Sequence, residues 1–280
     1  MALKLMYITN DPEVAKIAEA AGVDRIFVDL EYIGKAARQG GMDTVQSHHT
    51  VGDIEKVRKA ISKAELLVRV NPMHDASSEY CSSQEEIDAA VSSGADIVML
   101  PYFKTADEVS AFVGAVGGRA RTMPLLETPE AARAVGDILD IGGIDEMFVG
   151  LNDLSLGSGR RFMFELLADG TVEKLSFAFR ERGMPFGFGG IAAPGQGMLP
   201  AEYIIREHYR LGSTSVILSR SFLNTQAVTD LGEIERVFTS GVRAIREVER
   251  ECEEHSRFFS DNKKEVAERV KLVCDRIGRR

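Results

Sequence analysis

Cysteine is scarce in this 280-residue chain. The three cysteines are Cys81, Cys252 and Cys274, and no two of them have the short spacing of a metal-binding motif. A sparse, odd set of cysteines is typical of a reducing compartment and excludes a fold that depends on disulfides. Histidine and cysteine do not cluster at zinc spacing either. We therefore expect neither a structural zinc site nor a disulfide framework.

Long apolar runs are also missing. The N-terminal stretch MALKLMYITN is too short for a signal peptide, and no stretch approaches 18 consecutive apolar residues. The net charge of −9 and the pI of about 5.2 disfavour nucleic acid or an anionic membrane as the main partner. We therefore expect a cytoplasmic, soluble protein that acts on a small molecule and binds neither nucleic acid nor membrane.

A glycine-rich phosphate-binding turn is absent after the first apolar run, where the sequence reads YITNDPEV. An open, doubly wound sheet usually carries such a turn, so that fold is disfavoured. Eight short apolar runs alternate with helical patterns, which is typical of parallel strands buried on both faces. They are 3–8, 25–30, 65–70, 96–101, 122–127, 146–151, 185–190 and 215–220. Because eight strands close a barrel, we predict an α/β fold, a (β/α)8 TIM barrel.

Capping boxes mark two helix starts between these strands. In such a box a Ser or Thr accepts from a backbone N–H three residues on, and a Glu there bonds back. Ser83 with Glu86, and Thr105 with Glu108, have this spacing. Each pair predicts a helix that begins there.

The pattern changes after the last predicted strand. Residues 230–255 and 261–278 have the spacing of two long helices. We therefore predict a catalytic barrel over 1–225 and a C-terminal helical extension over 226–280. The last helix carries an apolar stripe that packs either on its own barrel or on a neighbouring subunit. The stripe consists of Val266, Val270, Val273 and Ile277.

Charged side chains stand where at least five predicted strands end. They are Asp29, Glu31, Arg69, Glu127, Asp153 and Arg220. The C-terminal strand ends form the active face of a barrel, so these side chains should meet there. Two carboxylates, waters and a chelating substrate suit Mg²⁺ or Mn²⁺. We predict that Glu127 and Asp153 hold the ion, although either could instead cap a helix, and Arg69 could be an ion-pair partner of Asp29 or Glu31.

The connection over 32–52 is long for a βα loop, which is typical of a lid or a substrate-facing loop. It contains His48 and His49, and histidine has a suitable pKa for proton transfer near neutrality. Tyr32 stands at its start. These three residues are candidates for the acid/base role, with a metal-bound water as a further candidate. An exposed histidine pair could equally be plain surface.

Five segments resemble the HpcH/HpaI aldolase and citrate lyase beta-subunit family, within the phosphoenolpyruvate/pyruvate barrel superfamily. They are AGVDRIFVDLE (21–31), LLVRVNP (66–72), GADIVMLPYFKTADEV (94–109), PLLETPEAARAVGDILDIGGIDEMFVGLNDLSLGSG (124–159) and LGSTSVILSRSF (211–222). The resemblance implies that Glu127 and Asp153 bind a divalent metal and that Arg69 contacts the oxygen of a pyruvate enolate. It also implies a homo-oligomer with C-terminal helices exchanged between neighbours.

The sequence departs from the family pattern at one functional position. The aldolases of the family follow their acidic motif with an acid/base histidine, and here that residue is Tyr32. The DLE and VRVNP motifs look more like citrate lyase beta-type members, whereas LNDLSLGSG looks more like the aldolases. The segment 160–183 also differs from the family.

The resemblance implies cleavage of a 4-hydroxy-2-oxo acid into pyruvate and an aldehyde, with Mg²⁺ as the expected ion and Mn²⁺ or Co²⁺ as alternatives. Asp29 and Glu31 would orient metal waters or the base. The substrate would contact Arg69 and the residues before Asp153, namely Gly150, Leu151 and Asn152. One alternative is an acyl-CoA lyase whose groove uses Lys35, Arg38, Arg160 and Arg161. Another is a non-catalytic metal-binding barrel subunit.

Overall fold

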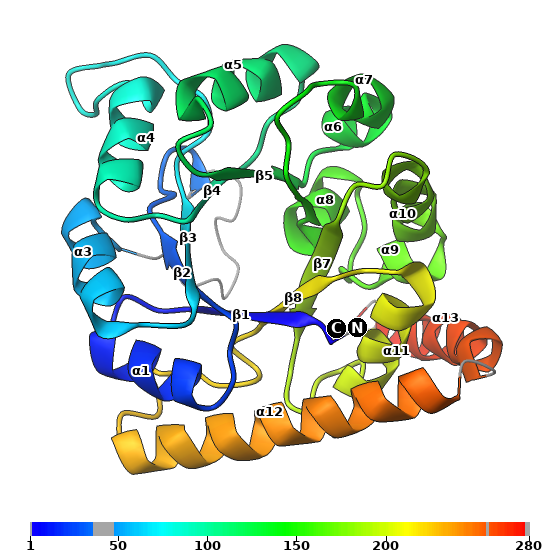
Figure 1. Ribbon diagram of the computed structural model, residues 1–280. Helices are drawn as coiled ribbons and strands as arrows, with labels where there is room; N and C mark the ends of the chain where they lie inside the picture. The colour runs from blue at the N-terminus through cyan, green and yellow to red at the C-terminus, as the bar shows by residue number, and fades with distance from the viewer. Residues whose placement is uncertain (1, 36–47, 256–257, 278–280) are drawn as a thin grey trace.

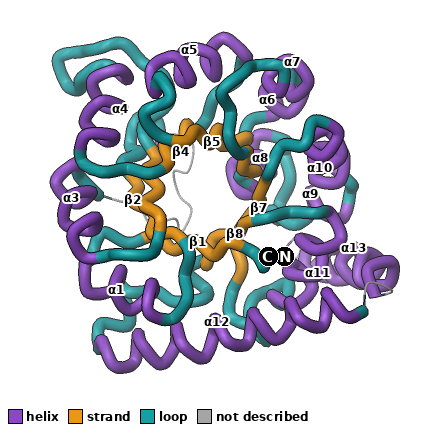
Figure 2. Tube along the Cα trace, in the orientation of Figure 1, coloured by secondary structure: helices purple, strands orange, loops and turns teal. Residues whose placement is uncertain are grey.

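Eight parallel strands close into a barrel in chain order, as Figure 2 shows, and this confirms the predicted fold. The computed structural model describes residues 2–35, 48–255 and 258–277. Each predicted apolar run overlaps one strand, with bounds that differ by a few residues at most. The strands are Lys4–Ile8 (β1), Arg25–Asp29 (β2), Glu65–Arg69 (β3), Ile97–Leu100 (β4), Arg121–Leu126 (β5), Met147–Val149 (β6), Phe186–Ile191 (β7) and Ser215–Leu218 (β8).

The strands are apolar along their whole length because both of their faces are covered. One set of side chains fills the barrel interior: Met6, Phe27, Leu67, Ile97, Met99, Met123, Leu125 and Phe148. The alternate residues, such as Leu5, Ile26 and Val68, belong to a second core with the surrounding helices. The interior is therefore packed with side chains, and a substrate can bind only at its mouth.

Helices surround the barrel, and Figure 1 shows them as an outer ring. They are Pro12–Ala20 (α1), Val51–Ala60 (α3), Ser83–Ser92 (α4), Ala106–Val116 (α5), Pro129–Arg133 (α6), Val135–Leu139 (α7), Leu151–Gly157 (α8), Glu165–Ala168 (α9), Thr171–Glu181 (α10), Ala201–Leu211 (α11), Leu231–Glu254 (α12) and Phe259–Ile277 (α13). The predicted capping box of Thr105 and Glu108 is confirmed at the start of α5. The box predicted for α4 was one residue too late, because Ser82 and Glu85 form it.

The two predicted C-terminal helices are α12 and α13. In Figure 1, α12 crosses beneath α1 and α11, and Arg246 of α12 donates to the carbonyl of Leu3, the residue before β1, at 2.8 Å. Three residues of the predicted stripe of α13, Val266, Val270 and Val273, are buried against the core of the chain, whereas Ile277 is 37% exposed. The stripe therefore covers its own barrel, and assembly between copies stays a prediction.

None of the described helices combines the length and the hydropathy that crossing a membrane would require. The expected boundary at 225/226 falls in the connection between β8 and α12. Most of the long loop, residues 36–47, lies outside the described residues, and so does the predicted lid.

Candidate active site

Asp29 and Arg69 form a two-point ion pair at the barrel mouth. They are the last residues of β2 and β3, and the parallel register places them side by side. Arg69 donates from Nε to Asp29 Oδ1 and from Nη2 to Oδ2, both at 2.8 Å. Its guanidinium carbon also lies 5.5 Å from the centre of the Phe27 ring. A guanidinium held in this way has a fixed orientation, so the alternative that Arg69 is an ion-pair partner is confirmed.

Glu31 and Lys35 extend the pair into a cluster of four charges. Lys35 Nζ lies 2.9 Å from Asp29 Oδ2 and 3.4 Å from Glu31 Oε2, and Arg69 Nη2 lies 3.2 Å from the same Glu31 oxygen. Burial alone would raise the pKa of Asp29, but the charges and hydrogen bonds of Arg69 and Lys35 hold that pKa far below its usual value. The same carboxylates raise the pKa of Arg69 against the effect of its burial. Asp29 and Arg69 therefore stay charged as an ion pair.

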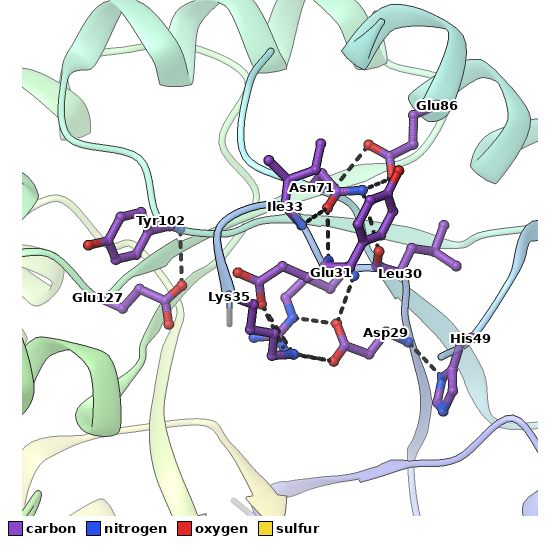
Figure 3. A network of polar contacts seen from close by, with 12 residues as sticks. Asp29, Leu30, Glu31, Ile33, Lys35, His49, Asn71, Glu86, Tyr102 and Glu127 are labelled. Atoms are coloured by element: carbon purple, nitrogen blue, oxygen red, sulfur yellow. Dashed lines mark hydrogen bonds and ion pairs between the residues drawn. The ribbon is translucent and has the colours of Figure 1, made fainter. Parts of the chain in front are cut away.

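Asn71 fixes the backbone that carries this cluster. Its Oδ1 accepts from the N–H groups of Tyr32 and Ile33, both at 2.9 Å. Its Nδ2 donates to Glu86 at 2.7 Å, and Figure 3 shows this network beside the cluster. Sequence reasoning did not single out Asn71, and it took Glu86 only as part of a capping box. The available signal was the position of Asn71, two residues after Arg69 in the VRVNP motif.

A cavity of about 480 Å³ opens beside Arg69. The predicted residues Asp29, Arg69, His48, His49 and Arg220 line it, as do Lys35 and neutral polar side chains that sequence reasoning missed. The neutral set is Thr9, Asn10, Ser219, Asn224, Thr225 and Gln226.

His49 is held against the end of β2. Its Nδ1 lies 3.0 Å from the backbone nitrogen of Asp29. Burial lowers the pKa of His49, and nearby Lys35 and Arg69 lower it further, against the opposing carboxylates of Asp29 and Asp53. His48, in contrast, is exposed.

Tyr32 does not belong to the described lining of the cavity. Its side chain is 55% exposed. Burial raises the pKa of its hydroxyl, and the charges that add to this rise include Glu86, Cys81 and Tyr80 on the α4 side. The structure thus places the Tyr32 side chain near Tyr80 and Cys81, away from the described cavity lining, and its role in proton transfer stays a prediction.

Glu127 follows β5 and lies at the same mouth, to the left of the cluster in Figure 3. It is only 3% exposed, and its Oε1 accepts from the backbone N–H of Tyr102 at 3.0 Å. Tyr102 adopts φ of 50°, a left-handed conformation that costs about 1 kcal/mol and directs this N–H at the carboxylate. Thr128, not Glu127, caps α6, so the capping alternative for Glu127 is wrong.

Gly150 allows this carboxylate to approach the neighbouring strand end. The pairing of Leu126 with Val149 brings Glu127 level with Gly150. A Cβ at Gly150 would lie 2.6 Å from Glu127 Oε2, so a larger residue would displace it. Asp153 lies in the first turn of α8, where it is half-buried and is not the N-cap.

Two carboxylates fit a hard divalent ion that keeps several waters, which is the usual binding mode of Mg²⁺. Glu127 offers one anchored oxygen and one that lies against the Gly150 backbone. Within the described ranges, no three or more His, Cys, Asp or Glu residues gather as a metal cage. The donor set therefore suits an ion completed by water and substrate. Of the other residues predicted for substrate binding, Leu151 is buried and Asn152 is exposed.

Two of the basic residues considered for a CoA groove, Lys35 and Arg160, are held in ion pairs within the described part of the chain. Lys35 is buried in ion pairs with Asp29 and Glu31. Arg160 pairs with Asp169 at 2.7 Å, and Arg38 lies outside the described residues.

Comparisons with known proteins agree with the resemblance. The sequence model described as HpcH/HpaI aldolase/citrate lyase matches residues 4–163, more than half of the chain. No curated protein matches the chain in sequence.

Solved structures share the fold. An HpcH/HpaI aldolase from Desulfitobacterium hafniense DCB-2 is 17% identical, with a TM-score of 0.61 over 84% of this chain and 93% of that one. A family protein from Burkholderia cenocepacia J2315 is 16% identical, with a TM-score of 0.61 over 83% and 95%. The citrate synthase SbnG is 15% identical, with a TM-score of 0.60 over 84% and 94%.

Proposed function

The chain belongs to the HpcH/HpaI aldolase/citrate lyase family, and we propose that it is a metal-dependent carbon–carbon lyase that cleaves a 4-hydroxy-2-oxo acid into pyruvate and an aldehyde. Membership supports a lyase or aldolase type of activity. The metal, the substrate and the direction of the reaction are our proposal, and the geometry of the mouth supports them.

The observation that carries the proposal is the fixed guanidinium of Arg69 at the cavity wall. Its contacts to Asp29 and Glu31 use Nε and Nη2. Nη1 is thus the part that can donate to a substrate oxygen. Cleavage of the C3–C4 bond leaves negative charge on the 2-oxo oxygen of the pyruvate enolate. A donor that is already oriented stabilises such charge without reorganisation.

Glu127 and Asp153 are the proposed metal ligands. Bound between them, a divalent ion would act as a Lewis acid on the 2-oxo acid. The chain itself contributes two anionic oxygens, one of them fixed by the Tyr102 amide. His48 remains the proposed base for the C4 hydroxyl, because it lines the cavity and is exposed.

The cavity wall also supports a choice of second reactant. Its amide and hydroxyl side chains come mainly from the loops after β1 and β8, for example Asn10, Asn224 and Gln226. Such groups match the hydrogen-bonding groups of a small hydroxylated aldehyde. We therefore propose an aldehyde of that class as the partner of pyruvate.

Exchange of the pyruvate methyl protons in D₂O tests the proposal, because it requires the enolate but not the aldehyde. We expect exchange with Mg²⁺, Mn²⁺ or Co²⁺, none in EDTA, and aldol addition when glyceraldehyde is present. Release of free CoA from an acyl-CoA ester, without pyruvate exchange, would instead show the acyl-CoA lyase. Neither reaction with any metal would show a non-catalytic barrel.

Substitution of the two ligands tests the site itself. Glu127→Gln and Asp153→Asn should each lower metal-dependent exchange on the order of 10³-fold, because the Lewis acid supplies several kcal/mol. Glu130→Gln is the control, since Glu130 is an exposed carboxylate on α6 that pairs with Arg133. Wild-type exchange in either ligand variant, with metal still required, would remove that residue from the ligand set.

A further inference from the structure

His49 is held from two sides. The backbone N–H of Asp29 donates to its Nδ1 at 3.0 Å. This N–H needs a partner outside the sheet, because β1 pairs with β2 only as far as Phe27. On the other side α3 begins at once, with Thr50 and Asp53 as a capping box. The imidazole therefore has a fixed position and a fixed orientation.

The contact with Asp29 determines which nitrogen carries the proton. A backbone N–H is only a donor, so Nδ1 must offer its lone pair and carry no hydrogen. The neutral ring then has its proton on Nε2. A second proton on Nδ1 would set two N–H groups against each other and break the bond to Asp29.

The surroundings reinforce the neutral form. The ring is half-buried, and burial lowers the pKa of His49. The nearby cations of Lys35 and Arg69 lower it further, while the carboxylates of Asp29 and Asp53 oppose them. His49 is therefore poorly suited to accept a proton at Nδ1, the only ring nitrogen with a lone pair.

The remaining N–H is on the side of the ring away from the strand. In Figure 3 a dashed line joins the ring to the backbone nitrogen of Asp29, and His49 lines the 480 Å³ cavity. No described residue hydrogen-bonds to Nε2. A donor at a cavity wall that has no partner among the described residues is placed to bind an oxygen of the ligand.

We propose that His49 is a neutral hydrogen-bond donor to the aldehyde oxygen and takes no part in proton transfer. This inference rests on the proposed aldolase function. In the addition direction C3 of the enolate bonds to the aldehyde carbon, and the carbonyl π electrons move to the oxygen. Nε2–H stabilises the charge that develops there, as neutral imidazole can. His48, which removes this proton in the cleavage direction, then returns it to the alkoxide, and His49 ends in the tautomer in which it began.

The tautomer can be measured without any activity. Long-range ¹⁵N–¹H correlation spectra of histidine-labelled protein should show an unprotonated Nδ1 and a protonated Nε2 for His49, assigned by its loss in His49→Gln. We expect this pattern from pH 8 down to about pH 6, below which a free histidine is mostly charged. A proton on Nδ1, or a charged ring near neutrality, would overturn the inference even if the enzyme is an active aldolase.

Two substitutions separate a donor from an acid or base. The amide of Gln reaches where Nε2 lies and can donate, but it cannot exchange protons near neutral pH. We expect His49→Gln to keep aldol addition within about tenfold of wild type, and His49→Leu to lose on the order of 10²-fold. Equal losses in both variants would show a proton-transfer role and contradict the inference.

Pyruvate exchange and a distant histidine complete the test. Exchange in D₂O does not involve the aldehyde, so both His49 variants should keep it near the wild-type rate. His255→Gln, at the exposed end of α12, should change neither reaction. Loss of exchange in His49→Leu would show a role in the pyruvate half of the site and overturn the proposal. If wild type shows no exchange and no addition, the proposed function has failed instead.

Discussion

Each end of the barrel holds two acidic and two basic side chains in mutual contact, and the two clusters differ in their surroundings. At the C-terminal end the cluster consists of Asp29, Glu31, Lys35 and Arg69. At the N-terminal end it consists of Arg25, Glu65, Arg121 and Glu146. The first lies beside a cavity, and among the described residues no member of the second lines it.

The N-terminal cluster is a closed ring. Arg25 bonds to Glu146 at 2.6 Å and to Glu65 at 2.8 Å, and Arg121 contacts the same two carboxylates from the other side. The Arg25 side chain is fully buried, and burial opposes the rise of its pKa that the two carboxylates cause. Every charge in this ring has partners within the ring, and we assign the ring to the stability of the fold, although Glu65 and Arg121 are about one-third exposed.

The C-terminal cluster also pairs two acidic with two basic side chains, but two of its residues contact groups outside the cluster. Arg69 lines the cavity and does not use Nη1 in its contacts to Asp29 and Glu31, and Asp29 donates its backbone N–H to His49. Similar ion pairs therefore serve different ends. We expect the N-terminal cluster to contribute to the free energy of unfolding and the C-terminal cluster, which borders the cavity, to orient groups for a substrate. Single substitutions test whether the two clusters differ in this way.

The largest effect is expected at Arg25. Arg25→Met should destabilise the fold by about 3–5 kcal/mol, because it leaves the buried Glu146 without its main partner. Urea unfolding measures the loss. Folded Arg25→Met should still catalyse pyruvate exchange at the wild-type rate.

Adding Glu146→Leu to Arg25→Met is the control, and it should recover part of the stability because the unpaired buried charge is removed. A single variant as stable as wild type would show that the ring contributes nothing. A single variant that is stable but inactive would contradict the division between the two ends.

Arg69→Lys should have the opposite effect from Arg25→Met, with a large loss of activity and a small loss of stability. An ammonium cannot keep two bonds to Asp29 and also donate to an enolate oxygen, so pyruvate exchange should fall about 10²-fold. The free energy of unfolding should change by less than it does in Arg25→Met, since one positive charge remains near Asp29 and Glu31. Exchange kinetics measure the activity and urea unfolding measures the stability, both on the same preparation. Near-normal exchange would make Arg69 a structural residue like Arg25.

A histidine outside both clusters gives the smallest expected effect. His208 is fully buried and stacks on Phe188 with ring centres 3.7 Å apart, and burial lowers its pKa to about 3. The unfolded chain, with a histidine pKa near 6.5, binds more protons between these two values. Stability from His208 is therefore fully present above about pH 6.5 and is lost as the pH falls towards 3.

The slope in that window is at most about 1.4 kcal/mol per pH unit. Urea unfolding at pH 5, 6 and 7 should show a steeper decline for wild type than for His208→Phe. Parallel declines would mean that another group causes the pH dependence. Neither cluster should respond through His208, because it lies between α11 and β7, on the outside of the barrel.

Much of the fold could be predicted from the sequence because buried parallel strands are continuously apolar and their number closes the barrel. The position of Glu127, Asp29 and Arg69 at strand ends was also readable. The α4 capping box was misplaced by one residue because Ser82 and Ser83 stand together and each is followed three residues later by Glu. Spacing alone could not choose between them.

Pairwise contacts could not be read from spacing. Lys35 resembled a surface lysine, and only the fold turns it inward onto Asp29 and Glu31. His49 resembled a base, and only the Asp29 amide fixes its proton on Nε2. Tyr32 occupies the position of a family histidine, yet its side chain lies outside the described cavity wall.

The sequence by itself determined the eight-stranded barrel, the strand-end charges and the family, because hydrophobic periodicity and local motifs are properties of neighbouring residues. The tertiary structure decided which charges meet, which cluster borders the cavity and which nitrogen of His49 is free to donate. Those features depend on register between strands and on groups 20 to 40 residues apart, such as Asp29 with His49 and with Arg69. Closure of the barrel is the step that brings them together.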